Sequence, residues 1–93
     1  MRWPRKREFM VYYYLFLRCG GEETTIERLT EAVRATFYYN SKTAKSIVRR
    51  LVNLGYIVRL DRSRARIRSP DEVLLELLGQ YLINRSKQVR ELS

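Results

Sequence analysis

The spacing of apolar residues changes abruptly at Gly55, and this change restricts the fold more than any other feature. Upstream of the glycine, apolar side chains recur three and four positions apart, as on the buried face of a helix; they are Ala44, Ile47, Val48, Leu51 and Leu54. Downstream, apolar and polar residues alternate in segments 56–60 and 65–68, which flank the polar segment 61–64. This pattern predicts a β-hairpin. Because glycine suits the left-handed position that ends a helix, the pattern predicts a helix over 41–54 that leads directly into the hairpin.

Three further segments have helical patterns. Residues 5–19 follow Pro4, are largely apolar and end before two glycines, which are typical start and stop signals. Residues 26–36 have apolar positions at helical spacing, and a short β-bridge is expected at 24–26. Residues 70–90 begin with a serine, a proline and two acids, a strong helix start. The predicted fold class is therefore mainly α with a small β-hairpin (α+β), in the order helix, helix, helix, hairpin, helix.

The length of the chain, 93 residues, predicts a single domain over 1–93. Its core is expected at 5–69 and a C-terminal dimerisation helix at 70–93. Residues 9–17 form an uninterrupted apolar run, so one face of the first helix cannot account for them, and their cover is either the C-terminal helix or a second subunit. Small domains often gain stability by oligomerising. We predict a homodimer whose interface contains Tyr13, Leu17, Leu74, Leu77, Leu78, Tyr81 and Leu82.

Positive charge is concentrated in residues 41–68. Nine of these 28 residues are Lys or Arg and only Asp61 is acidic, so the segment carries a formal +8 of the chain's +9. A surface of this kind binds polyanions, because each cation placed at a phosphate releases condensed counterions. A second, smaller basic segment at residues 2–7 is either an arm that contacts a nucleic-acid backbone or a solubilising end.

The composition excludes several classes of function. The chain has one cysteine and no histidine, so no common zinc site can be assembled, and no catalytic constellation is visible. We expect no enzyme activity, no metal and no cofactor. The nine-residue apolar run is far shorter than the roughly 20 residues that span a bilayer, and no signal-peptide cleavage site follows it, so we expect an intracellular protein without membrane contact. Cys19 is expected to fill a partly buried position, the alternative being an intersubunit disulfide.

The segment 40–57, Asn-Ser-Lys-Thr-Ala-Lys-Ser-Ile-Val-Arg-Arg-Leu-Val-Asn-Leu-Gly-Tyr-Ile, resembles the recognition helix and first wing strand of winged helix-turn-helix proteins. Its Leu-x-x-x-Gly-Tyr-Ile ending is the most characteristic part. The resemblance covers about residues 5–69 and weakens at the turn 37–39, which lacks the usual glycine. The size and the long C-terminal helix are also similar to small dimeric regulators of archaea and their viruses, and the high arginine content fits a thermophile. The resemblance implies a winged-helix fold that binds double-stranded DNA.

The candidate DNA-binding residues lie in two groups. On the expected recognition helix, the face opposite the apolar stripe presents Ser41, Lys42, Thr43, Lys45, Ser46, Arg49, Arg50 and Asn53. Because the N-terminal half of such a helix reads base edges, the base-reading candidates are Lys42, Thr43, Ser46 and Arg49. In the expected wing, the candidates for the DNA backbone or minor groove are Arg59, Arg62, Ser63, Arg64 and Arg66.

The leading hypothesis is a sequence-specific, homodimeric transcriptional regulator. A non-specific architectural DNA-binding protein would use the same cations but show little preference among sequences. A winged-helix module for protein or RNA contact is the third alternative, and it gives no reason for both DNA-contacting elements to be basic. The operator, the direction of regulation and any effector cannot be read from the sequence.

Overall fold

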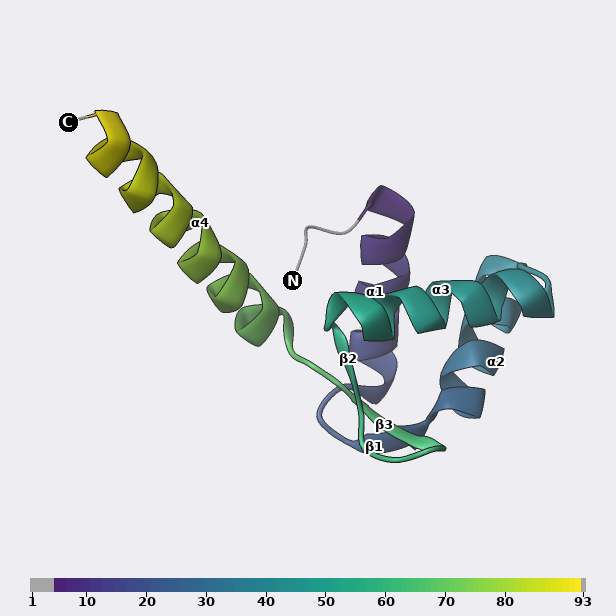
Figure 1. Cartoon of the computed structure of the whole chain (residues 1–93). Helices are drawn as coiled ribbons and strands as arrows, with labels where there is room; N and C mark the ends of the chain where they lie inside the picture. The colour runs from purple at the N-terminus through teal and green to yellow at the C-terminus, as the bar shows by residue number, and fades with distance from the viewer. Residues whose placement is uncertain (1–4, 93) are drawn as a thin grey trace.

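A computed structural model describes residues 5–92, with side chains described as far as residue 87. The elements in chain order are α1 (Lys6–Cys19), β1 (Glu23–Thr25), α2 (Ile26–Phe37), α3 (Ser41–Leu54), β2 (Ile57–Arg59), β3 (Arg64–Ile67) and α4 (Pro70–Leu92). Helices α1, α2 and α3 pack with a small antiparallel sheet, and α4 extends away from them (Figure 1). The predicted α+β class is confirmed.

Helix α3 has the bounds that its sequence predicts. The Asn40 side-chain oxygen accepts a hydrogen bond from the Thr43 N–H at 2.8 Å, which caps the first turn. Gly55 ends the helix in the left-handed region, at φ 91°. The five apolar residues of its stripe are all buried. They pack in one core with Val11, Tyr12, Leu15, Leu29, Val33, Tyr56, Ile57, Ala65, Ile67, Val73 and Leu77. One face of α3 is thereby fixed inside the domain and the other faces solvent.

The sheet has three strands in the order β1-β3-β2, with β3 in the centre. The predicted hairpin is confirmed as β2 and β3. The sequence predicted only a β-bridge near residue 25, whereas β1 is a full strand that pairs with β3, Thr24 opposite Ala65. The Ile26 N–H also donates to the Ser63 carbonyl oxygen at 2.8 Å. Strand β1 therefore ties the start of α2 to the turn of the hairpin.

The turn between α2 and α3 contains an unusual backbone conformation. Tyr38 has φ 60° and ψ 29°, in the left-handed region that costs a residue with a Cβ roughly 1–2 kcal/mol. This is the position at which the sequence lacks a glycine. Helix α2 also extends one residue beyond its predicted end, to Phe37. The left-handed residue reverses the chain so that Asn40 can cap α3.

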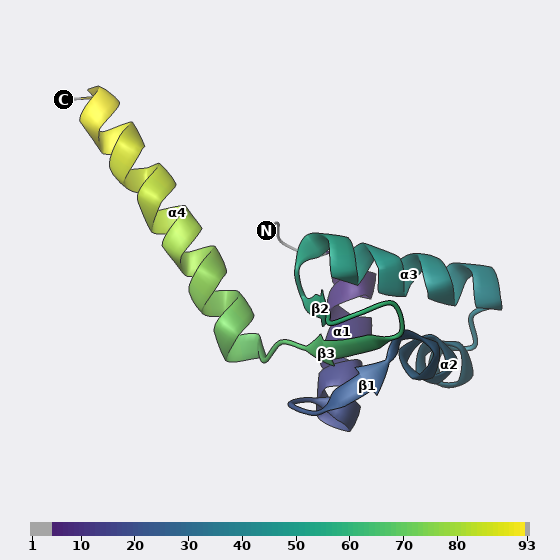
Figure 2. The same cartoon turned by 60° about the horizontal axis from the view of Figure 1, so that its bottom comes forward.

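Helix α4 contacts the rest of the domain only near its start. Val73 and Leu77 are buried in the core, and both views show the rest of the helix projecting away from α1, α2 and α3 (Figures 1 and 2). The sequence predicted Leu77 at the dimer interface. The structure instead buries the Leu77 side chain in the core of its own domain. In residues 5–92 no helix combines the length and apolar character needed to cross a membrane.

Arg68 fixes the junction between β3 and α4. Its backbone N–H donates to the Tyr56 carbonyl oxygen at 3.0 Å, and its carbonyl oxygen accepts from the Tyr12 hydroxyl at 2.7 Å. Its guanidinium donates to the Gly55 carbonyl oxygen at 3.2 Å and forms ion pairs with Glu72 and Glu76 of α4, at 3.4 Å and 2.7 Å. The residue thus joins α1, the end of α3, the sheet and the first turns of α4.

Candidate nucleic-acid interface

The exposed face of α3 brings together four of the predicted DNA-binding residues. Lys42, Ser46, Arg49 and Asn53 follow one another at intervals of four, three and four positions, so they share one side of the helix. All four are exposed, and this side is opposite the buried stripe. No acidic residue occurs in α3. The helix therefore presents a continuous polar and cationic face.

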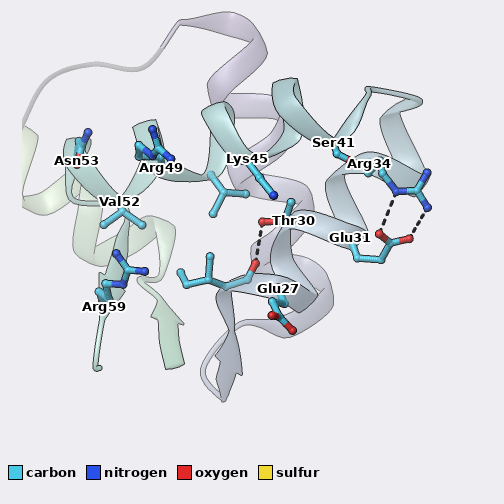
Figure 3. Close-up of a pocket in the computed structure, with 12 residues that line it drawn as sticks. Glu27, Thr30, Glu31, Arg34, Ser41, Lys45, Arg49, Val52, Asn53 and Arg59 are labelled. Carbon is cyan, nitrogen blue, oxygen red and sulfur yellow. Dashed lines mark hydrogen bonds and ion pairs between the residues drawn. The ribbon is translucent and has the colours of Figure 1, made fainter. Parts of the chain in front are cut away.

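Toward α2, this face continues into a groove of about 440 Å³ between α2, α3 and β2. Figure 3 shows Lys45 extending from α3 toward Thr30 of α2, with Arg49 and Arg59 at the other end of the groove. Ser41 also lines it, together with apolar atoms of Ile26, Val48 and Val52. The two predicted residues Ser41 and Lys45 thus lie at the edge of the cationic face rather than at its centre.

The α2 side of the groove is acidic. Glu27 and Glu31 line it opposite the cations of α3 and β2. Arg34 donates to both carboxylate oxygens of Glu31, and this hydrogen bonding lowers the pKa of that carboxyl from its ordinary value (Figure 3). The Glu31–Arg34 pair has no net charge, so Glu27 gives the α2 side of the groove its net negative charge and makes it the less favourable side for a DNA backbone.

Toward α1, the structure places Arg50 in a different role from the predicted one. Its Nε lies 2.7 Å from Oε1 of Glu8, which is only 4% exposed. The sequence predicted Arg50 on the DNA-binding face; the ion pair instead directs its guanidinium toward α1. Thr43, at the other end of the same edge, is half-buried, and its backbone N–H is used by the Asn40 cap.

The turn of the β2–β3 hairpin, residues 60–63, is organised by Asp61. Its Oδ1 accepts hydrogen bonds from the backbone N–H groups of Ser63 and Arg64, at 3.0 Å and 2.8 Å. These bonds and the Arg64 guanidinium hold the pKa of the Asp61 carboxyl far below its ordinary value. Arg64 also forms an ion pair with Glu23 of β1 at 3.1 Å. Arg64, a predicted DNA-binding residue, is therefore already paired with two acids, Asp61 and Glu23.

The other arginines of the hairpin differ in their contacts. Arg66 is half-buried, with a guanidinium nitrogen 3.9 Å from a carboxylate oxygen of Glu72. Arg59 donates to the carbonyl oxygen of Arg62 at 3.1 Å. Among the side chains of residues 5–87, the guanidinium of Arg62 has neither an ion pair nor a hydrogen bond. Arg62 is thus the cation of the turn that is most available to an outside ligand.

Two tyrosines of the α2–α3 turn, Tyr38 and Tyr39, are candidate phosphate donors by their position in the sequence, although packing is the more usual role of aromatic residues in such a turn. Tyr39 packs, stacked on Phe37 with ring centroids 5.9 Å apart. Tyr38 instead is 93% exposed and stands two residues before the N-cap of α3. The signal for it is the missing glycine, because an exposed aromatic in a left-handed turn has no packing reason to be there.

The remaining predicted residues are placed as follows. Tyr13 and Leu17 on α1 are exposed, and so are Leu74, Leu78, Tyr81 and Leu82 on α4. Cys19 is a half-buried free thiol. Residues 2–4 of the predicted basic arm lie outside the described residues. In the part of the chain that is described, no three His, Cys, Asp or Glu side chains are grouped in a way that could hold a metal ion.

Neither a protein-family model, nor a curated protein, nor a solved structure matches this chain. The assignment of function therefore depends on the geometry of the molecule alone.

Proposed function

We propose that the protein is a winged helix-turn-helix protein that binds double-stranded DNA sequence-specifically, as a homodimeric transcriptional regulator inside the cell. The element order supports this fold: α2 and α3 are joined by a short turn, a hairpin follows at once, and β1 adds a third strand to it. In such proteins the second helix of the pair enters the major groove. Here that helix is α3.

The observation that carries the proposal is the shared face of Lys42, Ser46, Arg49 and Asn53. An α-helix fits the major groove, where arginine and lysine bind guanine O6 and N7 and asparagine binds adenine N6 and N7. This face carries side chains of both kinds, and the helix has no acid to repel phosphate. A good bidentate contact discriminates against a wrong base by roughly 1–3 kcal/mol, which is enough for sequence preference.

The wing and the α2–α3 turn supply contacts to the DNA backbone in this proposal. Arg62 at the tip of the hairpin and Arg59 on β2 reach phosphates or the minor groove on one side. Tyr38 stands near the N-terminus of α3 with an exposed hydroxyl that can donate to a phosphate. These contacts position the helix, and the side chains of α3 read the bases.

The first experiment is selection from a randomised duplex pool at about 150 mM salt, followed by sequencing, because salt strongly changes the affinity of such proteins. We expect enrichment of a palindrome with half-sites roughly 10 base pairs apart, since a two-fold dimer reads two half-sites one helical turn apart. Arg49→Ala should lose or change the motif. Arg18→Ala, which removes the same charge from the end of α1, is the matched control and should retain it.

Two other results would assign the protein differently. Retention of DNA without an enriched motif would favour the architectural alternative, in which Arg59 and Arg62 make backbone contacts of equal strength on all sequences. No retention at all would contradict DNA binding and leave a protein or RNA partner for this surface.

Dimerisation has its own test. Leu78→Glu places a charge on the exposed apolar face of α4 and should give a monomer with weakened DNA binding, measured by light scattering and by titration of the selected duplex. Gln80→Glu adds the same charge on another side of α4 and is the control. A dimer that survives Leu78→Glu would exclude this face from the interface.

A further inference from the structure

Seven exposed residues of α4 form one continuous stripe along the helix, with charges only at its two ends. Each of its seven members has another member three or four positions away, so they lie on one side of the helix; they are Asp71, Leu74, Leu75, Leu78, Tyr81, Leu82 and Arg85. All seven are exposed. The buried residues Val73 and Leu77 lie on an adjacent side and face the domain.

The sequence of residue types along the stripe is arranged symmetrically about Leu78, with apolar residues next to it and one charge at each end. Seven positions before Leu78 stands the acid Asp71, and seven positions after it stands the base Arg85. The five stripe residues between these two charges are leucines and one tyrosine. Both views show α4 extending away from the other helices (Figures 1 and 2). An apolar stripe of this length on a protein surface marks an interaction site.

We infer that a second copy of this chain packs on the stripe with its α4 antiparallel and with the two-fold axis at Leu78. The inference rests on the homodimer of the proposed function and is independent of DNA binding. In an antiparallel pair centred on Leu78, each residue opposes the one equally far beyond the centre. Leu74 then opposes Leu82 of the second copy, Leu75 opposes Tyr81, and Asp71 opposes Arg85, so the stripe is complementary to itself.

The end charges select the antiparallel orientation. In a parallel pair Asp71 would face Asp71 and Arg85 would face Arg85, and like charges at these positions oppose pairing. Among the side chains of residues 5–87, neither Asp71 nor Arg85 has an ion pair or a side-chain hydrogen bond. The nearby acids Glu72 and Glu76 are already paired with Arg68. Asp71 and Arg85 are therefore the two charges of the stripe, and neither is paired within its own chain among the side chains of residues 5–87.

Gly79 supports close approach of a second helix beside the proposed axis. Glycine in an exposed helix interior is unfavourable compared with alanine, and a Cβ added here would meet nothing within 4 Å in the same chain. The chain's own packing gives no reason for glycine at this position. Leu75, Leu82 and Ile83 lie one turn away and are exposed, so glycine at position 79 leaves room beside the stripe for a side chain of the second copy.

Disulfide trapping tests the orientation directly. In a Cys19→Ser background, which removes the chain's single cysteine, chains with Asp71→Cys and chains with Arg85→Cys are oxidised separately and as an isotope-labelled equimolar mixture. A disulfide forms only where the Cα atoms come within about 7 Å. We expect cross-links between the two kinds of chain in the mixture and none in either single variant, as measured by mass spectrometry.

A charge-reversal cycle tests the same pairing without cross-linking. Asp71→Arg or Arg85→Asp alone should weaken the dimer about tenfold, because two attractive pairs become repulsive. The double variant should recover the wild-type dissociation constant to within about threefold, since it restores opposite charges across the two-fold axis.

The outcomes separate the inference from the proposed function, because no DNA is present. Cross-links within each single variant, but not across the mixture, would establish a parallel pair and overturn the inference. A dimer that gives no cross-link in any sample would place the interface on another surface. A chain that is monomeric throughout would also contradict the homodimer of the proposed function, while leaving DNA binding by the single domain to be decided by the duplex selection.

Discussion

The guanidinium of Arg50 on α3 forms an ion pair with the buried carboxylate of Glu8 on α1, with Nε and Oε1 2.7 Å apart. Arg50 lies in the most basic segment of the chain, yet it stabilises packing between two helices rather than the exposed face of α3. The two partners differ in environment, since the Arg50 side chain is 44% exposed and that of Glu8 only 6%. Loss of one partner therefore has a different cost from loss of the other.

Arg50→Met should lower the free energy of unfolding by about 3 kcal/mol, because it leaves a buried carboxylate without its counter-ion, with the Arg5 N–H still donating to Oε2 at 3.4 Å. Glu8→Gln should cost only about 1 kcal/mol, since the half-exposed guanidinium of Arg50 can turn to water. The double variant Glu8→Leu/Arg50→Met should regain most of the loss. Urea denaturation measures all three. Equal costs for the two single variants would contradict this asymmetry.

Tyr38→Gly should raise the free energy of unfolding by about 0.5–1 kcal/mol. The change relieves the left-handed strain of a residue with a Cβ, and the greater freedom of glycine in the unfolded chain offsets part of the gain. The same variant should weaken DNA binding if the exposed hydroxyl contacts a phosphate. Tyr38→Phe is the matched control, since it removes only the hydroxyl. A large loss of stability in Tyr38→Gly would show that the ring packs.

Arg62→Ala should reduce the slope of log affinity against log salt by about 1, because it removes one phosphate contact. Arg64→Ala removes the same charge but should change the slope less, since Arg64 already neutralises Asp61 and Glu23. Titrations of a fixed duplex at several salt concentrations compare the two variants. A larger effect of Arg64 would mean that the wing breaks these ion pairs when it binds.

Tyr12→Phe should remove part of the loss of stability at alkaline pH. Burial raises the pKa of the Tyr12 hydroxyl to about 12, from 10 in the unfolded chain. The neutral form is therefore favoured by folding, so its stabilising effect is complete below pH 10 and is lost as the pH rises toward 12. Denaturation between pH 9 and about 12 should show a smaller decline in the variant. Burial also raises the pKa of the Tyr56 hydroxyl. The stability of the variant should therefore still decline at alkaline pH.

The parts of the fold predicted correctly are those specified by local sequence. The bounds of α3 follow from its apolar spacing, its Asn40 cap and Gly55, all within one segment. The hairpin follows from alternation on either side of a polar turn. Strand β1 was missed as a strand because its three residues, Glu-Thr-Thr, show no apolar alternation. Its existence depends on pairing with β3, far along the chain.

The candidate site was only partly predictable, because charge counts do not show which charges are paired. Periodicity correctly placed Lys42, Ser46 and Arg49 on one exposed face. It could not show that Arg50, at the edge of that face, meets Glu8 from another helix, or that Arg64 is held by two acids. For the same reason Leu77 and Leu78 were predicted together, since only the angle of α4 against the domain separates a core leucine from an exposed one.

The contacts of Arg68 fix the direction in which α4 leaves the domain, and this gives the proposed dimer a fixed span. Two helices crossing at Leu78 would place their Pro70 residues about 24 Å apart, at 1.5 Å per residue. With both junctions held, the distance and rotation between the two α3 helices are constant. Insertion of about five base pairs between half-sites turns them to opposite faces of the duplex, where the dimer can reach only one. Such a protein measures the length of its site as well as its sequence.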